Sequence, residues 1–332
     1  MIIPPEIMIT KNLHPEDVKI LDDLECSEKI IFQQKTSFIN NVKVVENELG
    51  RFLKFEDNYQ GGKINHPLYK GNIPYINYFL LAAAMKKDIK NVLILGLGTG
   101  NFVNQLKSVL PQIKKIDVVE INPEIVEIAG KFFDFEKTGD IEIKIQDGRV
   151  FVRSCTEKYD LIILDIFSES GMAYRFMTKE FLEEISNILA FDGILASNLF
   201  GLTDLDSESN IIFKSLLKTY NSVFYDNLIF PTNYGNYEFY KLLIGLRHDL
   251  SDLTNIILFS GKEEIDIKTS KVLEIMDKLN INIDKYVQDF YLDDINLENA
   301  RLFFDEDENN TVFFNQFFKK YMNKFNEIFD NI

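Results

Sequence analysis

The sequence predicts an α/β fold built around a parallel sheet. From residue 91 to residue 220, short apolar runs rich in Val, Ile and Leu alternate with segments of helical periodicity. A glycine-rich turn, GLGTGN, directly follows the first apolar run. Strands that alternate with helices are joined by crossovers, which place the strands parallel and cover both faces of the sheet. A chain of 332 residues can bury such a core and carry further parts.

Residues 1–85 are predicted to form a helix and a small β domain ahead of this sheet. Residues 15–24, PEDVKILDDL, space their apolar side chains as in a helix. Residues 37–65 contain extended segments separated by turns, which predict a small β-hairpin layer. The stretch YINYFLLAAAMK, residues 75–86, is expected to be the helix that leads into the main domain.

Residues 86–247 are predicted to form the main domain. Five parallel strands are expected in NVLIL, IDVVE, IEIKI, YDLIILD and GILASNLF. The segments NSVFYDNLIF and NYEFYKLLIGL follow, and the short turn between them leaves no room for a crossover helix, so an antiparallel hairpin is expected. A parallel sheet ending in such a hairpin is typical of Rossmann-like S-adenosylmethionine-dependent transferase folds. A dinucleotide-binding fold would continue with another crossover.

Residues 248–332 are predicted to be a mainly helical C-terminal extension. The last segment has an aromatic stripe at helical spacing, formed by Phe314, Phe318, Tyr321, Phe325 and Phe329. Packing of this stripe against the main domain is the simpler interpretation. A partner face, for example in a homodimer, is the alternative.

The charge and the cysteine content exclude several classes of protein. A net charge of −16 argues against nucleic acid, whose phosphates require a basic surface. The acidity would suit a cationic substrate such as a polyamine, although solubility alone also explains it. Cys26 and Cys155 lack the spacing of a disulfide framework. The N-terminal MIIPPEIMIT does not read as a signal peptide, and no apolar stretch reaches the roughly 18 residues of a membrane span. We therefore expect a cytoplasmic protein without membrane contact.

The glycine turn predicts a site for a nucleoside-containing ligand. Gly96, Gly98 and Gly100 let the backbone turn tightly and allow a ligand to approach the start of the next helix, and Thr99 lies within this turn. A dinucleotide fingerprint would have glycine where Asn101 stands. The turn therefore fits a ligand without phosphate better.

Acidic residues end the second and third predicted strands. Glu120 is placed to accept hydrogen bonds from both ribose hydroxyls, although a solvated acid at a strand end is the alternative. Asp147 has acceptor oxygens that suit the exocyclic amine of adenine. Gly148 leaves space for the ring. These three residues extend the predicted nucleoside site along the sheet edge.

Asp165 ends the fourth strand, where ligands bind in open α/β sheets. It could hold or deprotonate an amine, or it could cap the loop that follows. The three histidines, His14, His66 and His248, are scattered, so neither a catalytic triad nor a zinc site is expected. No metal is predicted.

With these motifs in place, residues 37–246 resemble the spermidine synthase family of polyamine aminopropyltransferases. The resemblance rests on the order FEDNYQGG, PYIN, GLGTGN, VVEINPEIV, QDGRVFV, LILDIFSES and TKEFLEEISNILAFDGILASN. It implies that decarboxylated S-adenosylmethionine donates an aminopropyl group to a small-molecule amine by in-line attack, with methylthioadenosine as the leaving group. By resemblance, Gln60 contacts the donor, Glu120 binds its ribose and Asp147 its adenine. Asp165 helps to activate the attacking amine, and Tyr75 lies near it.

The sequence departs from the family pattern where cationic amines would bind. Thr99 stands in place of an acid that holds the donor ammonium group, and Ile76 and Asn77 replace His and Glu. Ser168 occupies the substrate-binding position of a second loop aspartate. The chain therefore resembles the divergent spermidine synthase-like proteins.

Three functions follow from these departures. The first is aminopropyl or related alkyl transfer from decarboxylated or intact S-adenosylmethionine. The second is methyl transfer from intact S-adenosylmethionine on the same scaffold. The third is a binding or assembly protein without catalysis.

Overall fold

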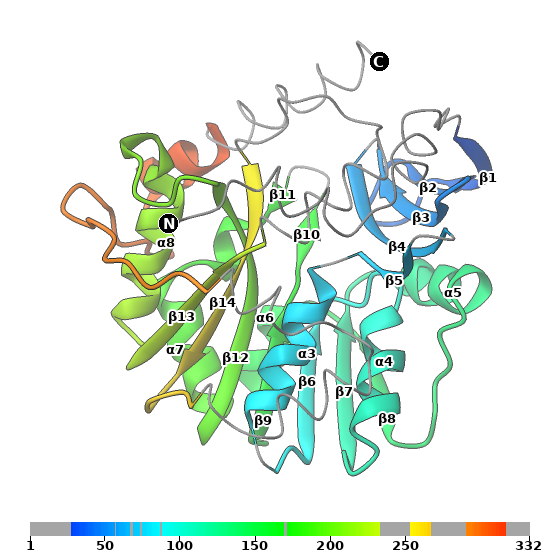
Figure 1. Cartoon of the computed structure of the whole chain (residues 1–332), viewed down its shortest axis with the longest axis horizontal. Coiled ribbons are helices and arrows are strands. Elements are labelled where there is room, and N and C mark those ends of the chain that lie inside the picture. Colours follow the sequence, from blue (N-terminus) through cyan, green and yellow to red (C-terminus); the bar gives the residue numbers. More distant parts are fainter. Residues whose placement is uncertain are drawn as a thin grey trace, which may run out of the picture.

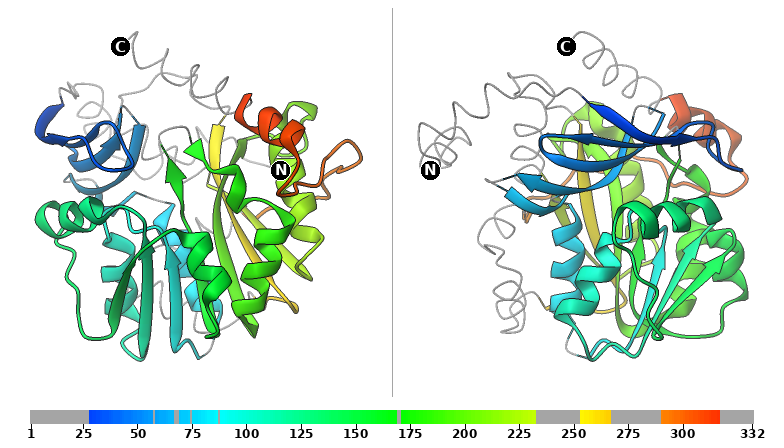
Figure 2. Two further views of the ribbon diagram at one scale, coloured as in Figure 1. Left: turned by 180° about the vertical axis from the view of Figure 1, so that it is seen from behind. Right: turned by 90° about the vertical axis from the view of Figure 1, so that its right-hand side faces the viewer.

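A computed structural model of the chain describes residues 28–56, 58–66, 69–73, 75–86, 88–168, 171–232, 253–266 and 290–316 (Figure 1). Two sheets dominate it, a small antiparallel sheet near the N-terminus and a larger one flanked by helices on both faces (Figure 2). Among the described residues, helices long and apolar enough to cross a bilayer do not occur. The helix expected over residues 15–24 lies outside the described residues.

The small sheet confirms the predicted N-terminal β layer and extends it at both ends. Its strands run in the order β1-β2-β3-β4-β5, and each neighbouring pair is antiparallel. The strands are β1 (Lys29–Gln34), β2 (Val42–Asn47), β3 (Gly50–Phe55), β4 (Asn58–His66) and β5 (Tyr69–Asn72). Apolar side chains of β2 and β3, including Val42 and Leu53, pack on Ile125 and Ile128 of α5. This contact fixes the small sheet on the main domain.

The large sheet has the order β13-β14-β12-β9-β6-β7-β8. The five neighbouring strands β12, β9, β6, β7 and β8 pair in parallel. They are β6 (Asn91–Leu95), β7 (Lys115–Glu120), β8 (Ile141–Ile145), β9 (Tyr159–Leu164) and β12 (Leu189–Leu202). The parallel α/β core is thus confirmed. Two very short strands, β10 (Phe167–Ser168) and β11 (Gly171–Met172), form a separate hairpin after β9.

The large sheet has an antiparallel end, as predicted. Strand β13 (Asp226–Pro231) pairs with β14 (Leu253–Gly261), and β14 is inserted between β13 and β12. The segment 236–246, expected to be the partner of β13, lies outside the described residues. The described partner of β13 is the later apolar run LTNIILFSG, which lies in the sheet interior. Residues 253–261 therefore belong to the sheet and not to a helical extension.

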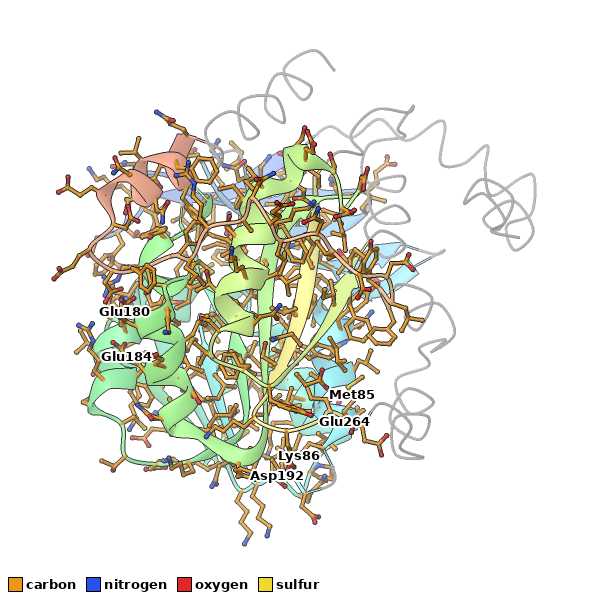
Figure 3. All side chains as sticks on the ribbon, turned by 90° about the vertical axis from the view of Figure 1, so that its left-hand side faces the viewer. Met85, Lys86, Glu180, Glu184, Asp192 and Glu264 are labelled. Carbon is orange, nitrogen blue, oxygen red and sulfur yellow. The ribbon has the colours of Figure 1, made fainter. Side chains whose placement is uncertain are left out.

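Helices cover both faces of the large sheet (Figures 1 and 2). On β6, Val92 and Ile94 pack toward α3 and α4, whereas Leu93 and Leu95 pack toward α7 and α8, as strand alternation requires. The helices are α3 (Ile76–Met85), α4 (Asn101–Val109), α5 (Pro123–Phe132), α6 (Gly148–Ser154), α7 (Lys179–Ile188) and α8 (Ile211–Asn221), with short 3₁₀ turns η1 (Tyr174–Phe176) and η2 (Glu208–Asn210). Lys86, which follows α3, forms an ion pair with Asp192 of β12 (Figure 3).

The C-terminal segment 290–316 packs beside α7 and α8 (Figure 2). Phe303 and Phe314 are fully buried in the same core cluster, and residues 308–316 are helical. For Phe314, core packing is therefore the correct interpretation of the aromatic stripe. The other four aromatic residues of that stripe lie outside the described residues.

Candidate active site

A cavity of about 340 Å³ lies between the small sheet and the carboxyl ends of β6, β7 and β9. Its size suits a small-molecule ligand. Most of the predicted site residues line it, namely Gln60, Tyr75, Gly96, Gly98, Thr99, Glu120, Asp147, Gly148 and Asp165. Gly100 is instead the N-cap of α4. Ser168 lies in β10, next to the lining residue Phe167.

The glycine turn brings two strand ends together. Gly96 has a φ of 97°, and a Cβ atom at this position would lie 2.3 Å from the Asp165 carbonyl oxygen. Glycine is therefore required for the end of β6 to pass so close to the end of β9. Gly98 has a φ of 55°, and a Cβ atom at this position would have no other atom within 4 Å. The turn is thus tight at Gly96 and open toward the cavity at Gly98.

Glu120 is held by the backbone around it. One carboxylate oxygen accepts a hydrogen bond from the Leu97 N–H (3.0 Å), and the other accepts from the Asn122 N–H (2.9 Å). Burial raises the pKa of Glu120, and these backbone donors oppose that rise. Each oxygen has acceptor capacity beyond one hydrogen bond. Glu120 is therefore fixed in place and still able to accept hydrogen bonds from a ligand diol.

Asp147 caps helix α6. Its Oδ1 atom accepts from the backbone N–H groups of Arg149 and Val150, both at 3.0 Å, and from the Arg175 guanidinium at 2.9 Å. Arg175 itself lines the cavity. These three donors all bind one oxygen, which orients the carboxylate at the cavity wall.

Asp165 forms a hydrogen-bonded pair with Tyr75. The Tyr75 hydroxyl donates to Oδ2 (3.1 Å), and the Asn198 side-chain amide donates to Oδ1 (2.9 Å). Burial raises the pKa of Asp165 to about 6, and these two donors limit the rise. The pKa of Tyr75 is also raised, first by burial and then by the Asp165 charge. The pKa of Asp165 therefore lies above that of an ordinary aspartate, because its carboxylate is desolvated at the end of β9.

Charged residues among the described cavity lining are mostly acidic. Glu120, Asp147 and Asp165 contribute carboxylates, and Arg175 contributes the guanidinium. An acidic, partly desolvated cavity favours a cationic ligand. Within the described part of the chain, groups of three metal-ligating side chains that could hold an ion were not found.

Four residues at the site were not predicted from the sequence. Phe38 (54% exposed) and Ile121 (38% exposed) are large apolar side chains that line the cavity. Arg175 lines it too, and Asn198 reaches it through Asp165. For Asn198 a signal was available, because its amide interrupts the apolar run GILASNLF. For Phe38 nothing in the local sequence indicates that its loop reaches the main domain.

The Phe38 loop is anchored to the start of α5. The Thr36 hydroxyl oxygen accepts from the Ile39 N–H (3.0 Å) and from the Asn122 side-chain amide (2.8 Å). Asn122 is the N-cap of α5 and lies two residues after Glu120. The loop therefore holds Phe38 at the cavity next to Glu120, the candidate ribose ligand.

The C-terminal segment supports the opposite wall. Buried Arg149 binds Glu184 of α7 (Figure 3) and Asp305 through two hydrogen bonds each. The Tyr174 hydroxyl donates to the Phe304 carbonyl oxygen (2.9 Å). Because Tyr174 lies in η1, these contacts fix the turn that carries Arg175 to the cavity.

Comparison with known proteins shows which family the chain is similar to. Residues 79–240 match the family model of the spermine/spermidine synthase domain. The chain is thus similar to the spermine/spermidine synthase family over this region. A polyamine aminopropyltransferase from Vibrio vulnificus is 28% identical over 239 residues, which are 68% of this chain and 77% of that protein. One from Clostridium beijerinckii is 31% identical over 189 residues, 55% of this chain and 63% of that protein. The resemblance drawn from the motifs is confirmed.

Solved structures agree on the fold. A probable spermidine synthase from Corynebacterium glutamicum superposes with a TM-score of 0.61 at 18% identity, covering 84% of this chain and 98% of that one. A spermidine synthase in complex with the transition-state analogue AdoDATO also gives 0.61, at 20% identity over 80% of this chain and 86% of that one. The predicted transferase fold is therefore confirmed.

Proposed function

We propose that this protein transfers an aminopropyl group from decarboxylated S-adenosylmethionine to an amine. One observation carries the proposal: the hydrogen-bonded Asp165–Tyr75 pair lies in the same cavity as the glycine turn and Glu120. The family match and the names of the relatives point in the same direction.

The residues fit such a donor. Glu120 is held at the end of β7 with free acceptor capacity, which suits the ribose hydroxyls, and Asp147 suits the adenine amine. Gln60 reaches the cavity from β4 of the small sheet. The acidic lining suits a sulfonium ion, which carries a positive charge throughout. The donor would thus lie along the carboxyl edge of the sheet with its reactive carbon toward Asp165.

The proposed step is an in-line displacement. The lone pair of the acceptor nitrogen forms a bond to the carbon beside the sulfonium, the carbon–sulfur bond breaks, and methylthioadenosine leaves with those electrons. The acceptor nitrogen must be unprotonated to attack. Once the new bond has formed, this nitrogen carries a positive charge and releases one proton. Asp165, with a pKa of about 6, is largely ionised at neutral pH and can accept a hydrogen bond or a proton from the amine. Tyr75 orients the carboxylate.

Product analysis by mass spectrometry tests this proposal. The protein is incubated with decarboxylated S-adenosylmethionine and a panel of mono-, di- and polyamines, and each amine is examined for the added mass of one aminopropyl group. Asp165→Asn should abolish product while leaving methylthioadenosine binding nearly unchanged, because Asp165 lies outside the predicted nucleoside contacts. Absence of nucleoside binding at millimolar concentration would rule out the proposal.

Methyl transfer from intact S-adenosylmethionine is the second candidate, and Thr99 favours it. This residue is buried against the small sheet, where a Cβ added to Gly61 would lie 2.9 Å from its methyl group. An uncharged residue here does not repel the carboxylate of an intact donor as an acid would. Calorimetric titration with both donors separates the candidates. Clear preference for the decarboxylated donor excludes methyl transfer.

A further inference from the structure

Two buried amides continue the hydrogen-bonded chain behind Asp165. Asn198 is 3% exposed and Asn255 is 8% exposed, and both lie on central strands of the large sheet. The Asn255 amide donates to the Asn198 side-chain oxygen (2.8 Å), and the Asn198 amide donates to Asp165 (2.9 Å). Burial of amides among apolar strands is costly unless they are hydrogen-bonded. Their position therefore depends on this chain of contacts.

The chain has a fixed direction. An ionised carboxylate can only accept hydrogen bonds, so Asn198 must turn its NH₂ group toward Asp165. The Asn198 carbonyl oxygen then points away from Asp165 and requires a donor, which Asn255 supplies. The pairing of β12 with β14 makes this contact possible, because Asn255 lies opposite Phe200, two residues along the same face from Asn198.

We propose that Asn255 is a positioning residue that fixes the Asn198 amide and thereby holds the Asp165 carboxylate in place beside Tyr75 and the cavity. The inference deepens the proposed function, on which its consequence for turnover rests. The orientation of the carboxylate itself follows from the contacts alone. Loss of the Asn255 donor would allow the Asn198 amide to rotate and present its oxygen to Asp165, which disfavours the ionised carboxylate.

The groups around Asp165 define what a titration would report. Tyr75, which precedes α3, bonds to it directly, and Asn198 faces it from β12. The charged groups that line the same cavity are Glu120 at the end of β7, Asp147 before α6 and Arg175 in η1. Because burial already raises the pKa of Asp165 to about 6 and Asn198 opposes that rise, weakening the Asn198 contact should raise the pKa further.

Carbon-13 NMR of the aspartate side-chain carboxyls measures this titration without turnover. The Asp165 signal is identified by its loss in Asp165→Asn. Asn198→Leu should raise the midpoint by about 1 to 2 pH units, since it removes a hydrogen bond to a charged group. Asn255→Leu should raise it by about half as much. The double variant should match Asn198→Leu alone, because Asn255 acts through Asn198.

Asn310→Leu is the matched control. This buried asparagine bonds to the Leu302 carbonyl oxygen and to Arg301, away from the cavity, and its replacement should leave the Asp165 midpoint unchanged. Should Asn255→Leu fail to fold, Asn255→Ala removes the same donor with less added bulk. An unchanged midpoint in the folded Asn255 variant would overturn the inference, and so would a double variant whose shift equals the sum of the single shifts.

Kinetics separate this inference from the proposed function. Where aminopropyl transfer is observed, the acidic limb of the pH profile of kcat should move to higher pH in Asn255→Leu, by the same number of pH units as the NMR midpoint. Movement of KM alone would contradict a positioning role. If no amine is alkylated by the wild-type protein, the proposed function fails, whereas the NMR titration still decides the role of Asn255.

Discussion

Replacement of Asp165 by asparagine should stabilise the protein above pH 6. The carboxylate is partly buried at the cavity wall, and its pKa is raised from an ordinary value of 3.8 to about 6, mainly because desolvation disfavours the charged form. An asparagine has nearly the same shape and carries no charge. It can still accept from Asn198 and pair with the Tyr75 hydroxyl, so the hydrogen bonds of the site can persist.

The size of the effect follows from the pKa shift. The change from 3.8 to about 6 is about 2.2 pH units, and about 1.36 kcal/mol per unit gives about 3 kcal/mol. A raised pKa means that the folded state binds the proton more tightly than the unfolded state. Both states hold the proton below pH 3.8, so the penalty is absent there. It grows between about pH 4 and pH 6, and it is complete above pH 7.

Urea unfolding of both proteins at several pH values between 4 and 8 measures this difference. Asp165→Asn should be about 3 kcal/mol more stable than the wild type at pH 8, and the difference should nearly vanish toward pH 4. Asp293→Asn, at an exposed position, controls for the loss of one negative charge from an acidic chain. A stability difference that does not change with pH, or a wild type that gains relative stability at high pH, would refute the reasoning.

Three further predictions concern the walls of the cavity. Phe38→Ala should weaken methylthioadenosine binding about tenfold in calorimetry, because the ring at the cavity would no longer be able to contact the nucleoside, whereas Phe191→Ala, at an exposed position outside the cavity lining, should not. Arg149→Leu should lower the free energy of unfolding in urea by about 2 to 3 kcal/mol, because it leaves two carboxylates without their buried partner. The partial exposure of these carboxylates limits the loss. Gly96→Ala should abolish nucleoside binding because a Cβ meets the Asp165 carbonyl, and Gly139→Ala, where open space surrounds the Cβ, should bind normally.

Most of the fold could be predicted because its signals are local. The parallel strands are continuous apolar runs, and the glycine turn directly follows the first of them, so periodicity and turn chemistry were sufficient. The antiparallel end could not be placed in the same way. Strand β14 pairs with β12 and β13 across a long separation in sequence, and a neighbouring apolar segment at 236–246 offered an equally plausible partner.

The site was predictable where strand ends alone determine position. Glu120, Asp147 and Asp165 each end a parallel strand or begin the following turn, so their convergence follows from the topology. Phe38, Arg175 and Asn255 could not be found in this way. They reach the site or its support through contacts between separate parts of the chain, and such contacts leave no local pattern.

The cavity therefore depends on more than the residues that match the family domain. Gln60 and Phe38 come from the small sheet that precedes residue 79, and Asn255 and Asp305 come from segments beyond residue 240. The contact of Asp305 with Arg149 supports the wall that carries Arg175, and Asn255 supports Asp165 through Asn198. A change in either outlying segment can thus alter the site without touching its glycine turn or Glu120.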